Sequence, residues 1–141
     1  MTHILVAVDL SPVSHVIARK ARNIADLLQA QLSVVHVLEY RPIAYGGSEF
    51  AIPLDNEVIA TLEQHAKTAL KKLGAEINVP EQHQYLKIDS VKQAIINLAE
   101  KLKVSLLVIG SHGRHGAALL LGSAANAILH SAQCDVLAVR I

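Results

Sequence analysis

Short runs of apolar residues are the feature that most constrains the fold of this 141-residue chain. Four such runs cover residues 4–8, 32–38, 104–109 and 136–141, and each contains several β-branched side chains. Because apolar residues fill consecutive positions rather than alternate ones, these runs are typical of strands covered on both faces, as in a parallel sheet. A weaker strand is expected over about residues 82–88.

Helical patterns separate these strands. Ser11 and Pro12 predict the start of a first helix, with Ser11 as its N-cap and Pro12 at the first helical position. The apolar stripe of this helix consists of Val13, Ile17, Ala21, Ile24 and Leu28. A second helix is expected over residues 54–73, ended by Gly74. Its stripe, interpreted as core packing rather than a partner groove, consists of Val58, Leu62, Ala66, Ala69 and Leu73.

Two further helices follow. Ser90 and Gln93 have the spacing of a capping box and precede an apolar helix face, and Ser123 predicts the cap of a last helix that runs through about His130. Residues 39–53 have no periodicity and contain two prolines and two glycines, so we expect a long surface loop there.

The alternation of strands and helices predicts the fold class. It indicates an α/β fold with a five-stranded open parallel sheet and helices on both faces, because right-handed crossovers place them there. The length favours a single domain over residues 1–141. In such sheets, ligands bind beyond the carboxyl ends of the strands, at the point where the strand order reverses.

Composition excludes several classes of protein. The formal net charge is +1 and aromatic residues make up 3%, which argues against a nucleic-acid partner. No apolar run approaches the ~20 residues of a membrane span, and the first nine residues lack the pattern of a signal peptide. The single cysteine, Cys134, is expected to be a small buried hydrophobic residue in a reducing compartment. These features predict a cytoplasmic protein without membrane insertion.

Two strand ends carry candidate functional residues. Asp9 directly follows the first strand, and the segment Gly110–Gly116 follows the fourth, with Gly122 and Ser123 at the start of the last helix. Glycines let backbone N–H groups converge, and a helix N-terminus adds a favourable dipole, so this segment is a candidate anion site. The alternative, that the glycines merely form a tight turn, has about equal weight from spacing alone.

Neighbouring polar residues add little specific chemistry. Arg114 is either a phosphate partner or a solvated side chain. His112 and His115 have no accompanying cysteine or carboxylate, so we expect no resident metal. Ser111 beside His112 lacks a third orienting group, and no nucleophile and base pair is evident. We therefore expect no catalytic residue here.

At these positions the chain resembles the universal stress protein family. Ile4–Ser11 resembles that family's first strand and its acidic end, Leu107–Gly113 its fourth strand and glycine loop, and Cys134–Val139 its last strand. The resemblance implies a nucleotide-binding-like fold with strand order 3-2-1-4-5. It also implies a homodimer formed largely through the last strand, residues Val136, Leu137, Ala138 and Val139.

The resemblance further implies a ligand. Family members that bind ATP carry Gly-x2-Gly-x9-Gly-Ser/Thr, whereas this chain has Gly110-x2-Gly113 followed by eight residues before Gly122-Ser123. The segment between Gly113 and Gly122 is thus one residue shorter and must follow a different path or draw Gly122 inward. The implied nucleotide-binding residues are Ala7, Val8, Asp9, Val37, Gly110, Ser111, His112, Gly113, Arg114, Gly122, Ser123 and Ala124.

Within this set, Asp9 and the backbone near Val37 would border adenine and ribose, and the glycines with Ser123 would hold the phosphates. Two residues have structural alternatives: Asp9 could cap the helix near Ser11, and the Val37 side chain could simply belong to the core. Asp135, where many family members have proline, keeps a backbone N–H available at the start of the last strand.

Three functions are therefore distinguished. The leading hypothesis is a stress-responsive regulator or sensor that binds ATP, or else ADP or AMP, with Mg²⁺ accompanying the nucleotide. The second is a nucleotide-free dimeric interaction module of the universal stress protein A type, acting on a protein partner of unknown identity. The third is a true ATPase or nucleotide transferase, which ranks lowest because no general base is present. At most slow ATP hydrolysis is therefore expected.

Overall fold

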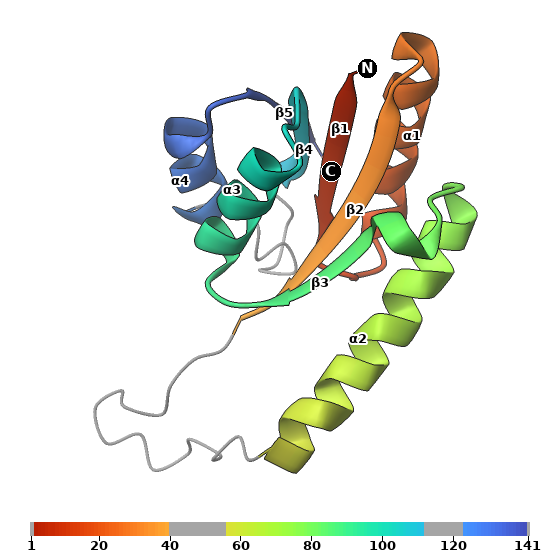
Figure 1. Ribbon diagram of the computed structural model, residues 1–141, viewed down its shortest axis with the longest axis vertical. Coiled ribbons are helices and arrows are strands. Elements are labelled where there is room, and N and C mark those ends of the chain that lie inside the picture. Colours follow the sequence, from red (N-terminus) through yellow and green to blue (C-terminus); the bar gives the residue numbers. More distant parts are fainter. Residues whose placement is uncertain (1, 40–55, 112–122, 141) are drawn as a thin grey trace.

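Five parallel strands form one sheet that is sandwiched between two pairs of helices (Figure 1). The computed structural model describes residues 2–39, 56–111 and 123–140. The strands are β1 (His3–Val8), β2 (Gln31–Leu38), β3 (Gln84–Ile88), β4 (Leu106–Ser111) and β5 (Asp135–Arg140). The helices are α1 (Ser14–Leu28), α2 (Asn56–Glu76), α3 (Val91–Lys101) and α4 (Ser123–Ser131). The strand order is β3-β2-β1-β4-β5, which confirms the predicted fold class.

The central strand β1 is buried on both faces. Ile4, Val6 and Val8 pack with α1 and α2 on one face, and Leu5 and Ala7 pack with α3 and α4 on the other. All five side chains are at most 1% exposed. This explains why the sequence has no alternation at residues 4–8, because both sets of side chains enter a core.

Several predicted boundaries are wrong by a few residues. β3 starts at Gln84 rather than about residue 82, because Glu81–His83 form a short 3₁₀ turn. β4 starts at Leu106 rather than Val104, whose N–H completes the end of α3 by donating to the Ala99 carbonyl. β5 covers residues 135–140 rather than 136–141, and residue 141 lies outside the described residues, as do residues 40–55 of the predicted surface loop.

The prediction that Gly74 ends the second helix is wrong. α2 continues through Gly74 to Glu76, and Asn78 then adopts a left-handed conformation with φ of 54°. The Val79 N–H donates to the Gly74 carbonyl at 2.8 Å, which closes the helix in the manner of a Schellman motif. A Cβ atom at position 74 would meet the end of the Gln84 side chain, which would have to shift to make room.

The apolar stripe of α2 is only partly core. Ala66, Leu70 and Leu73 are buried, but Leu62 is 45% exposed and Val58 36% exposed. Ala69 of the predicted stripe is also exposed. The N-terminal half of α2 extends past the end of β3 in Figure 1, so the sheet provides no surface for it to cover. The interpretation of the whole stripe as core packing is therefore wrong for this half.

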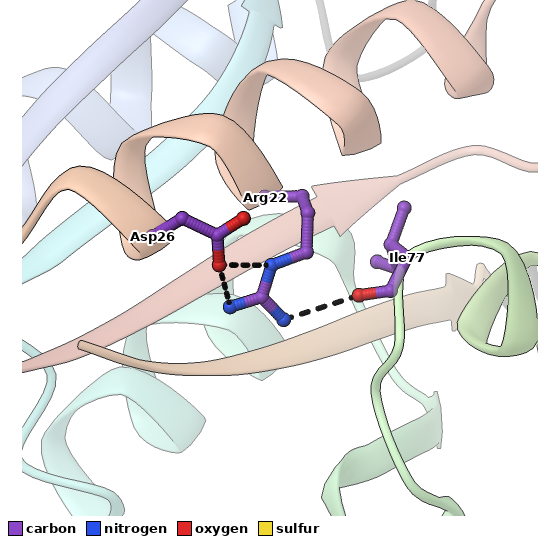
Figure 2. Close-up of polar contacts among 3 residues, drawn as sticks. All are labelled: Arg22, Asp26 and Ile77. Carbon is purple, nitrogen blue, oxygen red and sulfur yellow. Dashed lines mark hydrogen bonds and ion pairs between the residues drawn. The ribbon is translucent and has the colours of Figure 1, made fainter. Parts of the chain in front are cut away.

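A polar clamp joins the two helices on this face. The Arg22 side chain of α1 binds Asp26 Oδ1 through Nε at 2.9 Å and Nη2 at 2.8 Å (Figure 2). Its third nitrogen, Nη1, donates to the backbone carbonyl of Ile77 at 3.1 Å, just beyond the end of α2. A guanidinium at a helix C-terminus satisfies a free carbonyl and opposes the helix dipole, so Arg22 fixes the end of α2 against α1.

Two histidines, the half-buried His3 and the buried His36, bind backbone carbonyls at opposite ends of the strands. At the amino edge, His3 Nδ1 donates to the Leu102 carbonyl at 3.2 Å, and His3 Nε2 accepts from Ser33 Oγ at 2.8 Å. At the carboxyl edge, His36 Nδ1 donates to the Val8 carbonyl at 2.8 Å. Burial lowers the pKa of each imidazole below its usual range, and this outweighs the carbonyl hydrogen bonds, which raise it.

These pKa shifts predict acid-sensitive stability. The unfolded chain binds protons at His3 and His36 with a pKa near the ordinary ~6.5, above the folded values, so the free energy of unfolding falls as the pH drops below about 6.5. Urea unfolding at pH 7.5 and 5.5 measures this loss. We expect a double variant, His3→Asn with His36→Asn, to lose less stability than wild type over this range, and the exposed control His65→Asn to behave as wild type. An equal loss in the double variant would refute the assignment.

Candidate functional site

The candidate site lies where the sheet reverses its strand order, between β1 and β4. β1 pairs with β2 from His3 opposite Gln31 to Val8 opposite His36, over the full length of β1. Its pairing with β4 extends only from Ile4 opposite Leu106 to Val6 opposite Val108. The last two residues of β1 and the last three of β4 therefore lie beyond the paired register. Carboxyl ends that separate at a switch point are where open α/β sheets bind ligands.

Three strands and one helix bring predicted residues to this edge. Ala7 and Val8 end β1, Val37 is the penultimate residue of β2, and Gly110 and Ser111 end β4. Ser123 and Ala124 are the first two residues of α4. His112, Gly113, Arg114 and Gly122 lie outside the described residues, as does His115. The Val37 side chain is half-buried and packs against the core on the α3 and α4 face. This agrees with the alternative that the Val37 side chain belongs to the core.

The turn between β1 and α1 is built around Asp9. Asp9 Oδ1 accepts from the Ser11 N–H and from Ser14 Oγ, both at 2.9 Å. Between them Leu10 adopts φ of 62°, a left-handed conformation that costs a branched residue about 1–2 kcal/mol. Asp9 thus ties the strand end to the start of α1, but it does not cap the helix, because none of its hydrogen bonds comes from a backbone N–H of α1.

The prediction that Ser11 caps the first helix is wrong. α1 begins at Ser14, its N-cap is Val13, and no side chain accepts a capping hydrogen bond there. The reason is that the Ser11 N–H donates to the Asp9 carboxylate, which draws Ser11 into the turn. Ser11 Oγ is buried and has no hydrogen-bond partner among the described residues. A buried hydroxyl without a partner costs about 1–3 kcal/mol, so this group gains from any polar ligand that reaches it.

His36 is a residue of this edge that the sequence patterns did not single out. It lies in β2 opposite Val8, it is 9% exposed, and its ring binds the Val8 carbonyl. The nearby Asp9 carboxylate raises the pKa of His36, but desolvation dominates and favours the neutral ring. A histidine among the valines of β2 was the available signal, and only the register of β1 and β2 shows which group it contacts.

The capping box predicted for the third helix forms in part. Ser90 Oγ accepts from the Gln93 N–H at 3.3 Å, but the Gln93 side chain donates to Asn97 instead of returning to the Ser90 N–H. That N–H donates to Asp89 at 2.7 Å. The start of α3 is therefore held by Ser90 and Asp89 together.

Cys134 is half-buried rather than fully buried, and it lies just before the amino end of β5, at the opposite end of the strands from the switch point. Burial, followed by the neighbouring Asp135 carboxylate, raises the pKa of its thiol, so the thiolate is disfavoured. The thiol lines a cavity of about 350 Å³ beside α3 and the amino ends of β4 and β5. This cavity is separate from the switch point, which lies at the carboxyl ends of the strands.

The described residues contain neither a candidate metal-binding cluster nor a helix that could span a membrane. Within residues 2–39, 56–111 and 123–140, no three histidine, cysteine, aspartate or glutamate side chains lie close enough to hold a metal ion. None of the helices in these ranges combines the length and apolar character that crossing a bilayer requires.

Known proteins with the same sequence pattern and fold place this chain in a family. Residues 1–140 match the model of the Universal stress protein family. Universal stress protein A homolog 1 of Coxiella burnetii is 50% identical over 137 residues, which cover 97% of this chain and 94% of the relative. The solved structure of universal stress protein UspA from Lactobacillus plantarum is 24% identical with a TM-score of 0.74, and covers 99% of this chain and 97% of that chain.

A further solved structure contains a nucleotide. The universal stress protein from Archaeoglobus fulgidus, in complex with dAMP, is 21% identical to this chain. The two superpose with a TM-score of 0.62, over 100% of this chain and 98% of that one. With the family model matching nearly the whole sequence and a 50% identical relative beside it, the chain belongs to the universal stress protein family.

Proposed function

We propose that this universal stress protein is a cytoplasmic regulator or sensor that binds an adenine nucleotide, ATP with Mg²⁺, at the carboxyl ends of β1, β2 and β4. One observation carries the proposal. Pairing between β1 and β4 stops at Val6 and Val108, while both strands continue, so Asp9 and Gly110 lie beyond the last paired residues, at the switch point. The dAMP held by the Archaeoglobus relative supports the choice of an adenine nucleotide.

Different residues at this end of the sheet suit the adenine and ribose half of the nucleotide and its phosphate half. Adenine and ribose would lie against Val8, Asp9 and the backbone near Val37. The phosphates would lie near Gly110 and the first residues of α4, because the first N–H groups of a helix have no acceptor within it and the helix dipole favours negative charge there. Mg²⁺ takes most of its ligands from phosphate oxygens and water, so it requires few protein groups, and the Asp9 carboxylate is an oxygen donor at this edge.

ATP binding is tested by thermal unfolding. A ligand at ~100 times its dissociation constant stabilises the folded state by about 2.7 kcal/mol, so we expect millimolar Mg-ATP to raise the melting temperature by several degrees. Gly113→Val should abolish this rise, whereas Gly116→Val, a glycine of the same segment outside the spaced motif, should retain it. No rise in wild type would favour the nucleotide-free module. A rise that persists in Gly113→Val would move the phosphates to another loop.

We also propose that β5 pairs with its copy in a homodimer. β5 is an edge of the sheet, and Ala138 at its centre is exposed, with half-buried Val136 and Leu137 beside it. An edge strand with few charges offers unpaired N–H and C=O groups to another strand. A twofold axis would make that pairing antiparallel and self-complementary. This surface would serve the nucleotide-free alternative equally, so dimerisation does not distinguish the two functions.

Dimerisation is tested by analytical ultracentrifugation. We expect wild type to sediment as a dimer at micromolar concentration. Ala138→Glu should sediment as a folded monomer, because two like charges would face each other across the symmetry axis. Ala75→Glu, an equally simple change at an exposed position of α2, serves as the control and should remain dimeric. A monomeric wild type, or a dimeric Ala138→Glu, would remove β5 from the interface.

A further inference from the structure

The last two residues of β1 pair with a neighbouring strand on one side only. Beyond Val6 it has no paired register with β4, whereas its pairing with β2 continues to Val8 opposite His36. At that last position the His36 ring, 9% exposed, donates from Nδ1 to the Val8 carbonyl at 2.8 Å. Since a carbonyl only accepts, Nδ1 carries the hydrogen. The side chain of β2 thus adds a bond to β1 at the point where β4 no longer pairs with it.

The turn that follows is strained and tied down. Leu10 has φ of 62°, and the Asp9 carboxylate accepts from both Ser11 N–H and Ser14 Oγ. A branched residue keeps a left-handed conformation only when the surrounding contacts determine it strongly. Two sets of contacts do so here: the Asp9 hydrogen bonds fix the turn on the helix side, and the His36 hydrogen bond fixes it on the strand side.

We propose that His36 is a positioning residue of the nucleotide site. By anchoring the Val8 carbonyl, it holds Asp9 and the strained turn in the geometry that receives adenine and ribose. An apolar residue in its place would fill similar space on this face of β2 but leave the buried Val8 carbonyl without this donor. This inference rests on the proposed nucleotide site, and it assigns to His36 the base and ribose half of the ligand rather than the phosphates.

The experiment compares the binding of adenosine, AMP and Mg-ATP by calorimetry. His36→Leu should weaken all three by the same factor, about tenfold, as expected for the loss of one buried hydrogen bond. His36→Asn should bind within about twofold of wild type, because the asparagine amide nitrogen lies near the position of Nδ1 and restores the donor. His36→Gln, whose amide is one bond farther from the backbone, should bind more weakly than His36→Asn and provides the comparison if His36→Leu does not fold.

The matched control is His3→Leu. This variant removes a histidine that also binds a backbone carbonyl, that of Leu102, but at the amino edge of the sheet. It should lower the melting temperature and leave all three affinities unchanged. A second readout follows the turn itself: amide exchange at Ser11, whose N–H donates to Asp9, should accelerate in His36→Leu and remain slow in His3→Leu.

The outcomes separate the two proposals. Wild type that binds none of the three ligands overturns the nucleotide site and, with it, the role of His36. Wild type that binds while His36→Leu or His36→Gln binds equally well overturns only the role of His36. A loss confined to Mg-ATP, a loss without faster exchange at Ser11, or an equal loss in His3→Leu also contradicts positioning through the Val8 carbonyl.

Discussion

Burial of β1 on both faces is the constraint on which the rest of the structure depends. Its even-numbered side chains enter the core under α1 and α2, and its odd-numbered ones enter the core under α3 and α4. A strand in this position needs a neighbour on each edge and a helical layer on each face, so the chain must cross from one side of β1 to the other. That crossing makes the carboxyl end of β1 the switch point of the sheet.

Function is therefore expected where this strand ends. The pairing with β4 stops before either strand does, so Val8 and Gly110 lie beyond the register that joins the two strands. Asp9, held by Ser11 and Ser14, and His36, held by the Val8 carbonyl, keep this edge ordered without help from β4. The ordered side suits a rigid base and ribose. The glycine-rich side, followed by the N-terminus of α4, suits phosphates.

The sequence predicted the fold better than it predicted the site. Periodicity and continuous apolar runs locate the strands and helices because they report burial directly, and the strand order followed from the family resemblance. Two local signals gave wrong predictions. Gly74 looked like a helix stop, but α2 continues to Glu76 and the left-handed residue that follows it is Asn78. Ser11 looked like an N-cap, but its N–H binds Asp9. His36 gave no local signal of its role, since its partner is set by the register of two strands.

The most direct measurement of the central claim is a crystal structure of the protein grown with AMP. We expect electron density for adenine and ribose beside Val8, Asp9 and the backbone near Val37, with the phosphate directed toward Gly110 and the start of α4. Density for AMP in the cavity beside Cys134, or a switch point without ligand at saturating AMP, would contradict it.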